Sequence, residues 1–146
     1  MQENIRVLII EDDAFLNRLY ADKLSRAGFE VDVAGTGEEA THKIAQKSPD
    51  VVILDIMLPN ENGFDFLSRL KLDEATADIP VVILTNLGQP QDIERGRALG
   101  ADRYLVKTEF SIMQLPAVVR ECAAARRTVK APPTPPSAAE SAGEQT

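Results

Sequence analysis

The sequence of 146 residues lacks several features that would point to particular protein classes. It contains one cysteine, Cys122, which excludes an internal disulfide and a metal site built from several cysteines. No apolar run approaches the roughly 20 residues that a membrane-spanning helix needs. The opening stretch MQENIRVLII lacks the basic region, the apolar region and the cleavage site of a secretory signal. These absences predict a cytoplasmic protein with no membrane partner.

Positive charge is also scarce. The chain has 16 lysines and arginines against 23 aspartates and glutamates, so its formal net charge is −7. Surfaces that bind nucleic acid are basic, and this balance therefore argues against direct nucleic-acid binding. It suits a protein that binds cations or basic patches on partners. With 44% hydrophobic residues, the chain can still bury a sizeable core, and its length suggests one domain.

The composition changes near residue 128. Residues 128–146, TVKAPPTPPSAAESAGEQT, contain four prolines, many small residues and almost no large apolar ones. Such a segment cannot bury enough apolar surface to fold alone. We therefore expect a compact domain over residues 1–127 and a disordered Pro/Ala/Ser-rich tail or linker over residues 128–146.

Short apolar runs rich in β-branched residues alternate with helical patterns inside the domain. Runs without polar alternation are typical of strands covered on both faces, as in a parallel sheet. Apolar residues at helical spacing predict the helices, with a T-x-x-E capping box at Thr36 and Glu39, and Gly28 and Gly100 at helix ends. The predicted strands are residues 5–10, 29–34, 51–54, 80–84 and 103–106, and the predicted helices are residues 14–27, 36–46, 64–72, 91–99 and 111–127.

This alternation predicts an α/β fold: a doubly wound parallel sheet of five strands with helices on both faces and right-handed crossovers. The run 29–34 alternates between apolar and polar residues, which indicates an edge strand. In such folds ligands bind beyond the carboxyl ends of the strands, near the point where the strand order reverses. Residues that directly follow the strands are therefore the candidates for a site.

Acidic, hydroxyl and basic residues follow four of the five predicted strands. Crowded carboxylates need a cation, and oxygen-only ligands favour Mg²⁺, with Mn²⁺ as the other suitable ion. A lysine and a hydroxyl that face the same point suit a phosphate, and a carboxylate can itself attack phosphorus. The residues that follow the strands are Glu11, Asp12, Asp13, Asp55, Thr85 and Lys107.

Four stretches, in this order and strand context, resemble one known family. They are VLIIEDD, VVILDIMLPNENG, PVVILT and ALGADRYLVK. The chain resembles the response-regulator receiver domain of two-component signal transduction, in the CheY-like superfamily, over residues 5–127. The resemblance implies a flavodoxin-like fold with strand order 2-1-3-4-5 and five helices.

The resemblance also implies a metal site and a phosphoacceptor. Asp55 matches the aspartate that is phosphorylated, and Glu11 and Asp12 match the acidic pair. Asp12 would bind Mg²⁺ directly and Glu11 through water, with the backbone carbonyl of Met57 as a further ligand. Asp13 stands directly before a predicted helix, and its favoured interpretation is the N-cap of that helix.

Three more residues match the switching parts of the family. Thr85 matches the switch hydroxyl, and Lys107 matches the lysine that faces the phosphoryl group. Tyr104 matches the aromatic residue that turns inward when the hydroxyl engages that group. Together with Asp55, Thr85 and Lys107 would catalyse phosphorylation and dephosphorylation of the domain itself. The resemblance implies no metabolic enzyme activity.

The implied function is a phosphoaspartate switch. A sensor histidine kinase or a phosphotransfer protein would donate the phosphoryl group to Asp55 in a Mg²⁺-dependent reaction, and a downstream output protein or domain would read the result. One alternative is a phosphorylation-independent interaction module of the same fold. Another is a phosphohydrolase with an aspartate nucleophile, but Met57 stands where such enzymes carry a second carboxylate. A flavin-binding protein is a third, although the acidic first loop would repel its phosphate.

Two features depart from the family or bear on signal lifetime. Thr108 follows Lys107 where the family usually has proline. Met57 and Leu87 lie where side chains can influence the attacking water, and both are apolar, so we expect a long-lived phosphoryl group.

The fourth helix, fifth strand and fifth helix form the usual output or dimer surface of the family, so a homodimer through these elements is an expectation. The residues assigned to this surface are Ile93, Arg97, Tyr104, Ile112, Leu115 and Val119.

Overall fold

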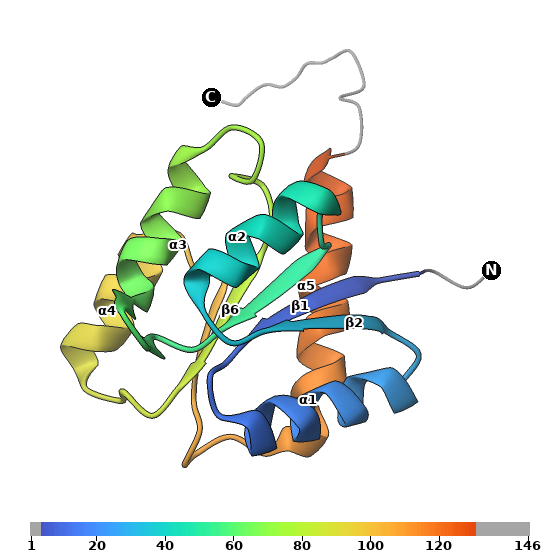
Figure 1. Ribbon diagram of the computed structural model, residues 1–146, viewed down its shortest axis with the longest axis horizontal. Coiled ribbons are helices and arrows are strands. Elements are labelled where there is room, and N and C mark those ends of the chain that lie inside the picture. The colour runs from blue at the N-terminus through green and yellow to red at the C-terminus, as the bar shows by residue number, and fades with distance from the viewer. Residues whose placement is uncertain (1–3, 131–146) are drawn as a thin grey trace, which may run out of the picture.

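The computed structural model describes residues 4–130, and a parallel sheet of five strands lies at its centre (Figure 1). The strand order is β2-β1-β3-β6-β7, which is 2-1-3-4-5 when only the strands of this sheet are numbered. The predicted fold is therefore confirmed, with β2 at an edge. The strands are β1 (Arg6–Ile10), β2 (Glu30–Ala34), β3 (Val51–Leu54), β6 (Val81–Thr85) and β7 (Arg103–Val106).

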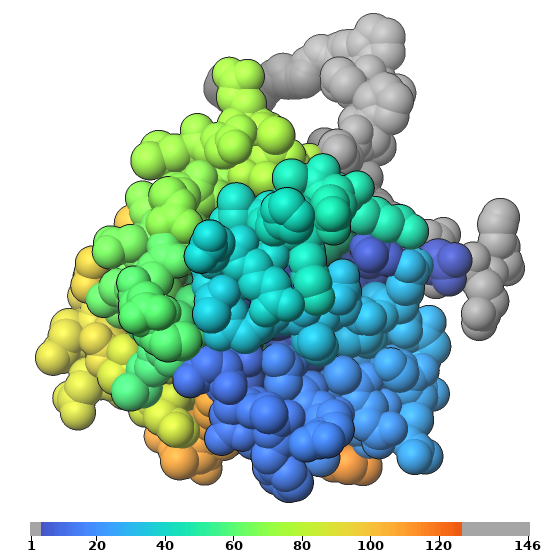
Figure 2. Space-filling view, viewed as in Figure 1, coloured from blue at the N-terminus to red at the C-terminus, as the bar shows by residue number. Residues whose placement is uncertain are grey.

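Five α-helices in the described residues cover the two faces of this sheet. One core packs α2, α3 and α4 against one face, and a second core packs α1 and α5 against the other. Figure 2 shows side chains of α2 and α3 covering the middle of the sheet on the side turned to the viewer. The helices are α1 (Ala14–Arg26), α2 (Gly37–Gln46), α3 (Gly63–Leu72), α4 (Pro90–Ala98) and α5 (Leu115–Lys130).

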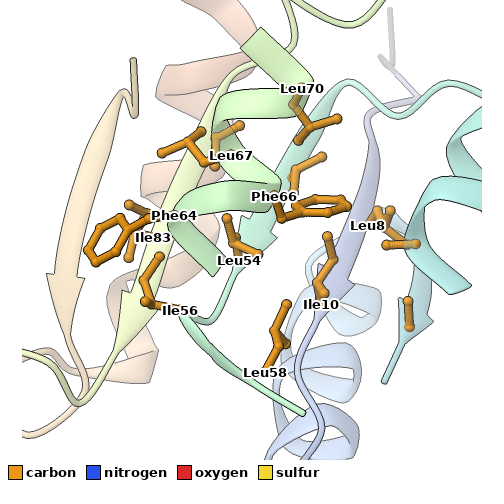
Figure 3. Packing of buried hydrophobic residues seen from close by; sticks show 14 of the residues in the cluster. Leu8, Ile10, Leu54, Ile56, Leu58, Phe64, Phe66, Leu67, Leu70 and Ile83 are labelled. Atoms are coloured by element: carbon orange, nitrogen blue, oxygen red, sulfur yellow. The ribbon is translucent and has the colours of Figure 1, made fainter. Parts of the chain in front are cut away.

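Successive residues of β1 enter opposite cores, as the pleat of a strand requires. Leu8 and Ile10 pack with α2 and α3, whereas Val7 and Ile9 pack with α1 and α5. Figure 3 shows that Leu8 and Ile10 of β1 face Phe66 of α3. Burial on both faces explains why the run carries no polar alternation, and it makes the sheet a rigid platform for the residues at its ends.

A small antiparallel hairpin lies between β3 and α3. Its strands β4 (Met57–Leu58) and β5 (Glu61–Asn62) are too short to have been predicted from sequence. Asn60 lies in the turn with φ of 64°, a left-handed conformation that asparagine adopts more readily than most residues. The N–H of Gly63 donates to the carbonyl of Ile56 at 2.8 Å, and a Cβ on Gly63 would lie 2.5 Å from the Cα of Ile56. The close return of the chain behind Asp55 therefore requires glycine at residue 63.

Polar side chains cap the N-termini of the first two helices. The carboxylate of Asp13 accepts from the backbone N–H groups of Phe15 and Leu16, which confirms Asp13 as the N-cap of α1. The hydroxyl of Thr36 accepts from the N–H of Glu39 at 3.0 Å, as the capping box predicts. These caps set the start of α1 and of α2 within a few residues of the preceding strand end.

The start of the fifth helix differs from the prediction of residue 111. Ile112–Gln114 forms a 3₁₀ turn, and α5 begins at Leu115. Pro116 explains the later start, because it lacks a backbone N–H and fits only the first turn of an α-helix.

The fifth helix extends past the expected domain boundary at residue 127. The helix runs to Lys130, so it includes the first three residues assigned to the tail. The rest of that expected tail, residues 131–146, lies outside the described residues. No helix within residues 4–130 combines the length and apolar character needed to cross a bilayer.

Candidate functional site

Main-chain hydrogen bonds fix the predicted site residues at the carboxyl ends of adjacent strands. The N–H of Glu11 donates to Ala34 of β2, and that of Asp55 donates to Ile10 of β1, both at 3.0 Å. The N–H of Lys107 donates to the carbonyl of Thr85 at 2.8 Å. Residues from β1, β3, β6 and β7 therefore meet at one edge of the sheet, where the strand order reverses between β1 and β3.

One lysine bridges two buried carboxylates at this edge. The Nζ of Lys107 donates to Oδ2 of Asp55 at 2.8 Å and to Oε1 of Glu11 at 2.6 Å. Glu11 is 3% exposed and Asp55 is 5% exposed. Burying a carboxylate without a partner is costly, so the ammonium group is what allows both residues to lie here.

Burial and pairing shift the pKa values of Glu11 and Lys107. Burial raises the pKa of Glu11, and the hydrogen bond from Lys107 offsets only part of that effect. Burial alone would lower the pKa of Lys107, but its hydrogen bonds to Asp55 and Glu11 outweigh this and raise the pKa to about 12. Lys107 is therefore a permanent cation across the physiological pH range.

Three carboxylates approach closely enough to share a cation. One ligand atom each of Glu11, Asp12 and Asp55 lies within 4.8 Å of the others. With Lys107 beside them, three negative groups and one positive group remain, and a divalent cation would neutralise the difference. The donor set is oxygen only and Asp12 is exposed, so the residues fit Mg²⁺ or Mn²⁺ with a solvent-facing approach. Asp13 is not in this group, since its carboxylate caps α1.

The two oxygens of the Asp55 carboxylate have different partners. Oδ1 accepts from the backbone N–H of Met57 at 3.0 Å, and Oδ2 accepts from Lys107. Met57 is the first residue of β4, two positions after Asp55 in the sequence, and it is 56% exposed. The hairpin therefore orients Asp55 while its first side chain stays in contact with solvent.

Sequence analysis missed Asn17. Asn17 lies on α1, one turn after Asp13, and its side-chain Nδ2 donates to the backbone carbonyl of Glu11 at 2.8 Å. The first helix therefore fixes the position of the acidic loop. The signal was a polar residue four positions after an N-cap, which is too common to single out by itself. Asn17 acts on the loop that carries Glu11 and Asp12 and does not belong to the carboxylate group.

Thr85 and Tyr104 meet through the loop that follows β6. Thr85 is fully buried, and its hydroxyl accepts a long hydrogen bond of 3.4 Å from the N–H of Leu87. Tyr104 is 9% exposed, and its hydroxyl donates to the carbonyl of Leu87 at 2.7 Å. Burial raises the pKa of Tyr104 to about 12. The tyrosine therefore lies inward, and the backbone of Leu87 contacts the side chains of both Thr85 and Tyr104.

Three of the residues named for the face of α4, β7 and α5 are buried: Tyr104, as described above, and two residues of α5. Leu115 and Val119 are fully buried in the core between α5 and the sheet. Their helical spacing reflects the core-facing stripe of α5. Arg97 is exposed, so it remains available on the surface, while Ile93 and Ile112 are partly buried.

The sheet topology and its acidic end define the class of protein: a flavodoxin-like α/β domain with a carboxylate and lysine site at the switch point. The family model described as the response regulator receiver domain matches residues 7–120. The chain therefore belongs to the response-regulator receiver family of two-component signalling.

Relatives with longer chains match at the level of sequence. The chain is 44% identical over 127 residues to the DNA-binding dual master transcriptional regulator RpaA of Synechocystis, covering 87% of this chain and 52% of RpaA. It is 38% identical over 122 residues to the phosphate regulon transcriptional regulatory protein PhoB of Pseudomonas aeruginosa, covering 84% of this chain and 52% of PhoB. The chain thus spans about half the length of these relatives.

Solved structures match over nearly their whole length. The receiver domain of the Francisella response regulator 1452 has a TM-score of 0.77 and 30% identity, covering 84% of this chain and 98% of that one. The chemotaxis response regulator CheY4 of Vibrio cholerae has a TM-score of 0.75 and 28% identity, covering 82% and 99%.

Proposed function

We propose that this protein is a phosphoaspartate switch in which Asp55 accepts a phosphoryl group from a sensor histidine kinase or a phosphotransfer protein. The observation that carries the proposal is the bridge from Lys107 to Asp55 and Glu11 at the switch point of the sheet. In this proposal Asp55 is the nucleophile and Lys107 the permanent cation. Glu11 and Asp12 are the acidic pair that binds the metal beside the same phosphoryl group. Family membership supports the same role, because receiver domains are phosphoacceptors rather than metabolic enzymes.

The transfer makes one bond and breaks one. A carboxylate oxygen of Asp55 forms the new P–O bond as the P–N bond of the donor phosphohistidine breaks, and its electron pair remains on the imidazole nitrogen. Lys107 offsets the negative charge that the incoming group brings. Asp12 and Asp55 would hold Mg²⁺ directly, Glu11 through water, and the carbonyl of Met57 would add a further ligand. Bound there, Mg²⁺ would supply positive charge to the phosphoryl oxygens.

The readout uses the residues joined through Leu87. The phosphoryl group adds negative charge beside the end of β6, and the hydroxyl of Thr85 is the nearby switch donor that can turn toward it. Movement of this strand end shifts the loop whose carbonyl holds Tyr104. The surface of α4, β7 and α5 would then change its affinity for an output protein or a second copy of the chain.

An intact-mass measurement tests the proposal. The protein is incubated with Mg²⁺ and a small acyl-phosphate donor, and Asp55→Asn is treated in parallel. We expect a mass gain of one phosphoryl group in the natural sequence, none in the variant, and none when Mg²⁺ is chelated. No adduct from either that donor or a cognate kinase would overturn the proposal and favour a phosphorylation-independent interaction module.

Nucleic-acid binding lies outside the proposed function of this domain. DNA binding is named for RpaA, of which the chain covers 52%. The formal net charge of −7 supports a domain that acts through protein partners.

A further inference from the structure

Gly96 lies in the last turn of α4, and its backbone packs directly against the ring of Tyr104. A Cβ added at Gly96 would lie 2.7 Å from Cδ2 and 2.9 Å from Cε2 of that ring, closer than side chains ever approach. The ring cannot easily yield, because its hydroxyl is tied to the carbonyl of Leu87 at 2.7 Å. The inward position of Tyr104 therefore depends on the absence of a side chain at residue 96.

The backbone of α4 gives no other reason for this glycine. The glycines with positive φ within the described residues are Gly28 and Gly100, so Gly96 has a conformation that alanine would also adopt. Within a helix, glycine lowers the equilibrium constant for folding by up to about fivefold relative to alanine. Glycine at this position lowers stability, and its backbone packs on an aromatic ring. We infer that contact with the ring is the reason for glycine at residue 96.

The other neighbour of Gly96 can adapt. The added Cβ would lie 2.9 Å from Cδ1 of Ile83, the flexible end of an aliphatic side chain. Tyr104, in contrast, stands on β7, which is the edge strand of the sheet beyond β6. A ring pushed away from α4 has no further strand to enter on that side, so its outward position faces solvent.

We propose that residue 96 is a positioning residue that sets whether Tyr104 lies inward or outward. Glycine at residue 96 leaves space for the inward position of the ring, and a larger residue would fill that space. The signalling consequence rests on the proposed function, in which Tyr104 couples the phosphorylated site to the partner surface. The contact itself, between Gly96 and the ring, exists in the unphosphorylated protein and is tested without phosphorylation.

The test combines a double-mutant cycle with a direct measure of ring position. Gly96→Ala, Tyr104→Ala and the double variant are unfolded in urea, and Glu94→Ala, at an exposed position of α4, is the matched control. In the Tyr104→Ala background, Gly96→Ala should raise the equilibrium constant for folding by up to about fivefold, because the obstacle is gone. In the natural background this gain should vanish or reverse. An equal gain in both backgrounds would overturn the inference.

Ring position is read by NMR on protein labelled at its two tyrosines, with Tyr20→Phe to assign the signals. We expect the cross-peaks between the Tyr104 ring and residue 96 to disappear in Gly96→Ala, and the ring signal to broaden when a soluble paramagnetic agent is added. Glu94→Ala should leave both readouts unchanged. A ring that stays protected in Gly96→Ala would overturn the inference.

The same spectra after treatment with Mg²⁺ and an acyl phosphate separate the two proposals. We expect Asp55 to gain its adduct in Gly96→Ala while Tyr104 stays outward. If the natural sequence gains no adduct, the proposed function fails and the contact result stands. If the adduct forms and the variant's ring returns fully inward, the positioning role of Gly96 fails and the switch stands.

Discussion

The Nζ of Lys107 lies 2.8 Å from Oδ2 of Asp55, although the two residues are 52 positions apart in the sequence. The same nitrogen lies 2.6 Å from Glu11, which is 96 positions away. One cation thus joins the ends of β1, β3 and β7, and the residues that we propose for phosphoryl transfer also hold the edge of the sheet together.

Replacing Lys107 by methionine should destabilise the fold. Two buried carboxylates would lose their shared cation, and breaking a buried pair costs about 3 kcal/mol. Added Mg²⁺ should restore part of the loss, since a divalent cation can take over the neutralising role. Urea unfolding with and without Mg²⁺ measures both effects.

Lys47→Met is the control for this prediction, because Lys47 is an exposed lysine in a surface ion pair with Glu30. Its free energy of unfolding should change by less than about 1 kcal/mol and should not depend on Mg²⁺. Equal effects of the two substitutions would contradict the central role of Lys107.

The neighbours Asp12 and Asp13 should behave in opposite ways toward Mg²⁺. Asp12 belongs to the carboxylate group, whereas the carboxylate of Asp13 is occupied at the N-terminus of α1. Asp12→Asn should weaken Mg²⁺ binding by at least about tenfold, as loss of a charged ligand does. Asp13→Asn should leave Mg²⁺ affinity within about twofold, because asparagine caps helices as well as aspartate. Calorimetric titration with Mg²⁺ compares the two, and a comparable loss of affinity in both variants would assign the acidic pair to Asp12 and Asp13.

The sheet and the charged site were predictable because each rests on a local signal. A strand buried on both faces is an uninterrupted apolar run, and parallel strands bring the residues that follow them to one edge. Glu11, Asp55 and Lys107 are found by this rule without any contact being known. The resemblance to receiver domains then assigned their roles.

The parts that were not predictable depend on distances across the chain. A two-residue strand such as β4 has no periodicity to detect. The contact between Tyr104 and Gly96 joins a strand to a helix. From the sequence alone, a glycine that is needed for such a contact looks the same as a glycine that the helix merely tolerates. For Leu115 and Val119 the sequence left open whether they are exposed, because one apolar stripe on a helix serves a core and an interface equally well.

The thiol of Cys122 should make stability fall at alkaline pH. Burial raises the pKa of Cys122 from its ordinary value of 9.0 to about 11. The unfolded chain therefore loses this proton at lower pH than the folded protein does, and stability falls as pH rises from about 9 to about 11, by about 1.4 kcal/mol per pH unit.

Comparison with Cys122→Ala isolates this effect from other groups that titrate at high pH, including Lys107. The difference in unfolding free energy between the two proteins should be constant below pH 9 and should shift against the natural protein above it. A difference that stays constant up to pH 11 would show that the folded thiol ionises as freely as the unfolded one.

The lifetime of the phosphoryl group should depend on the side chain of Met57. This side chain is 56% exposed next to Asp55, and as a thioether it cannot orient a water molecule for attack on phosphorus. Met57→Asn introduces a donor and an acceptor at the same place and should shorten the half-life by on the order of tenfold, the scale of a positioning effect. Decay of the phosphorylated species by intact mass measures the rate, and Leu72→Asn, at a position 82% exposed on α3, should leave it unchanged. A natural protein that already loses its phosphoryl group within seconds would contradict the premise, because water would then be positioned by a group other than residue 57.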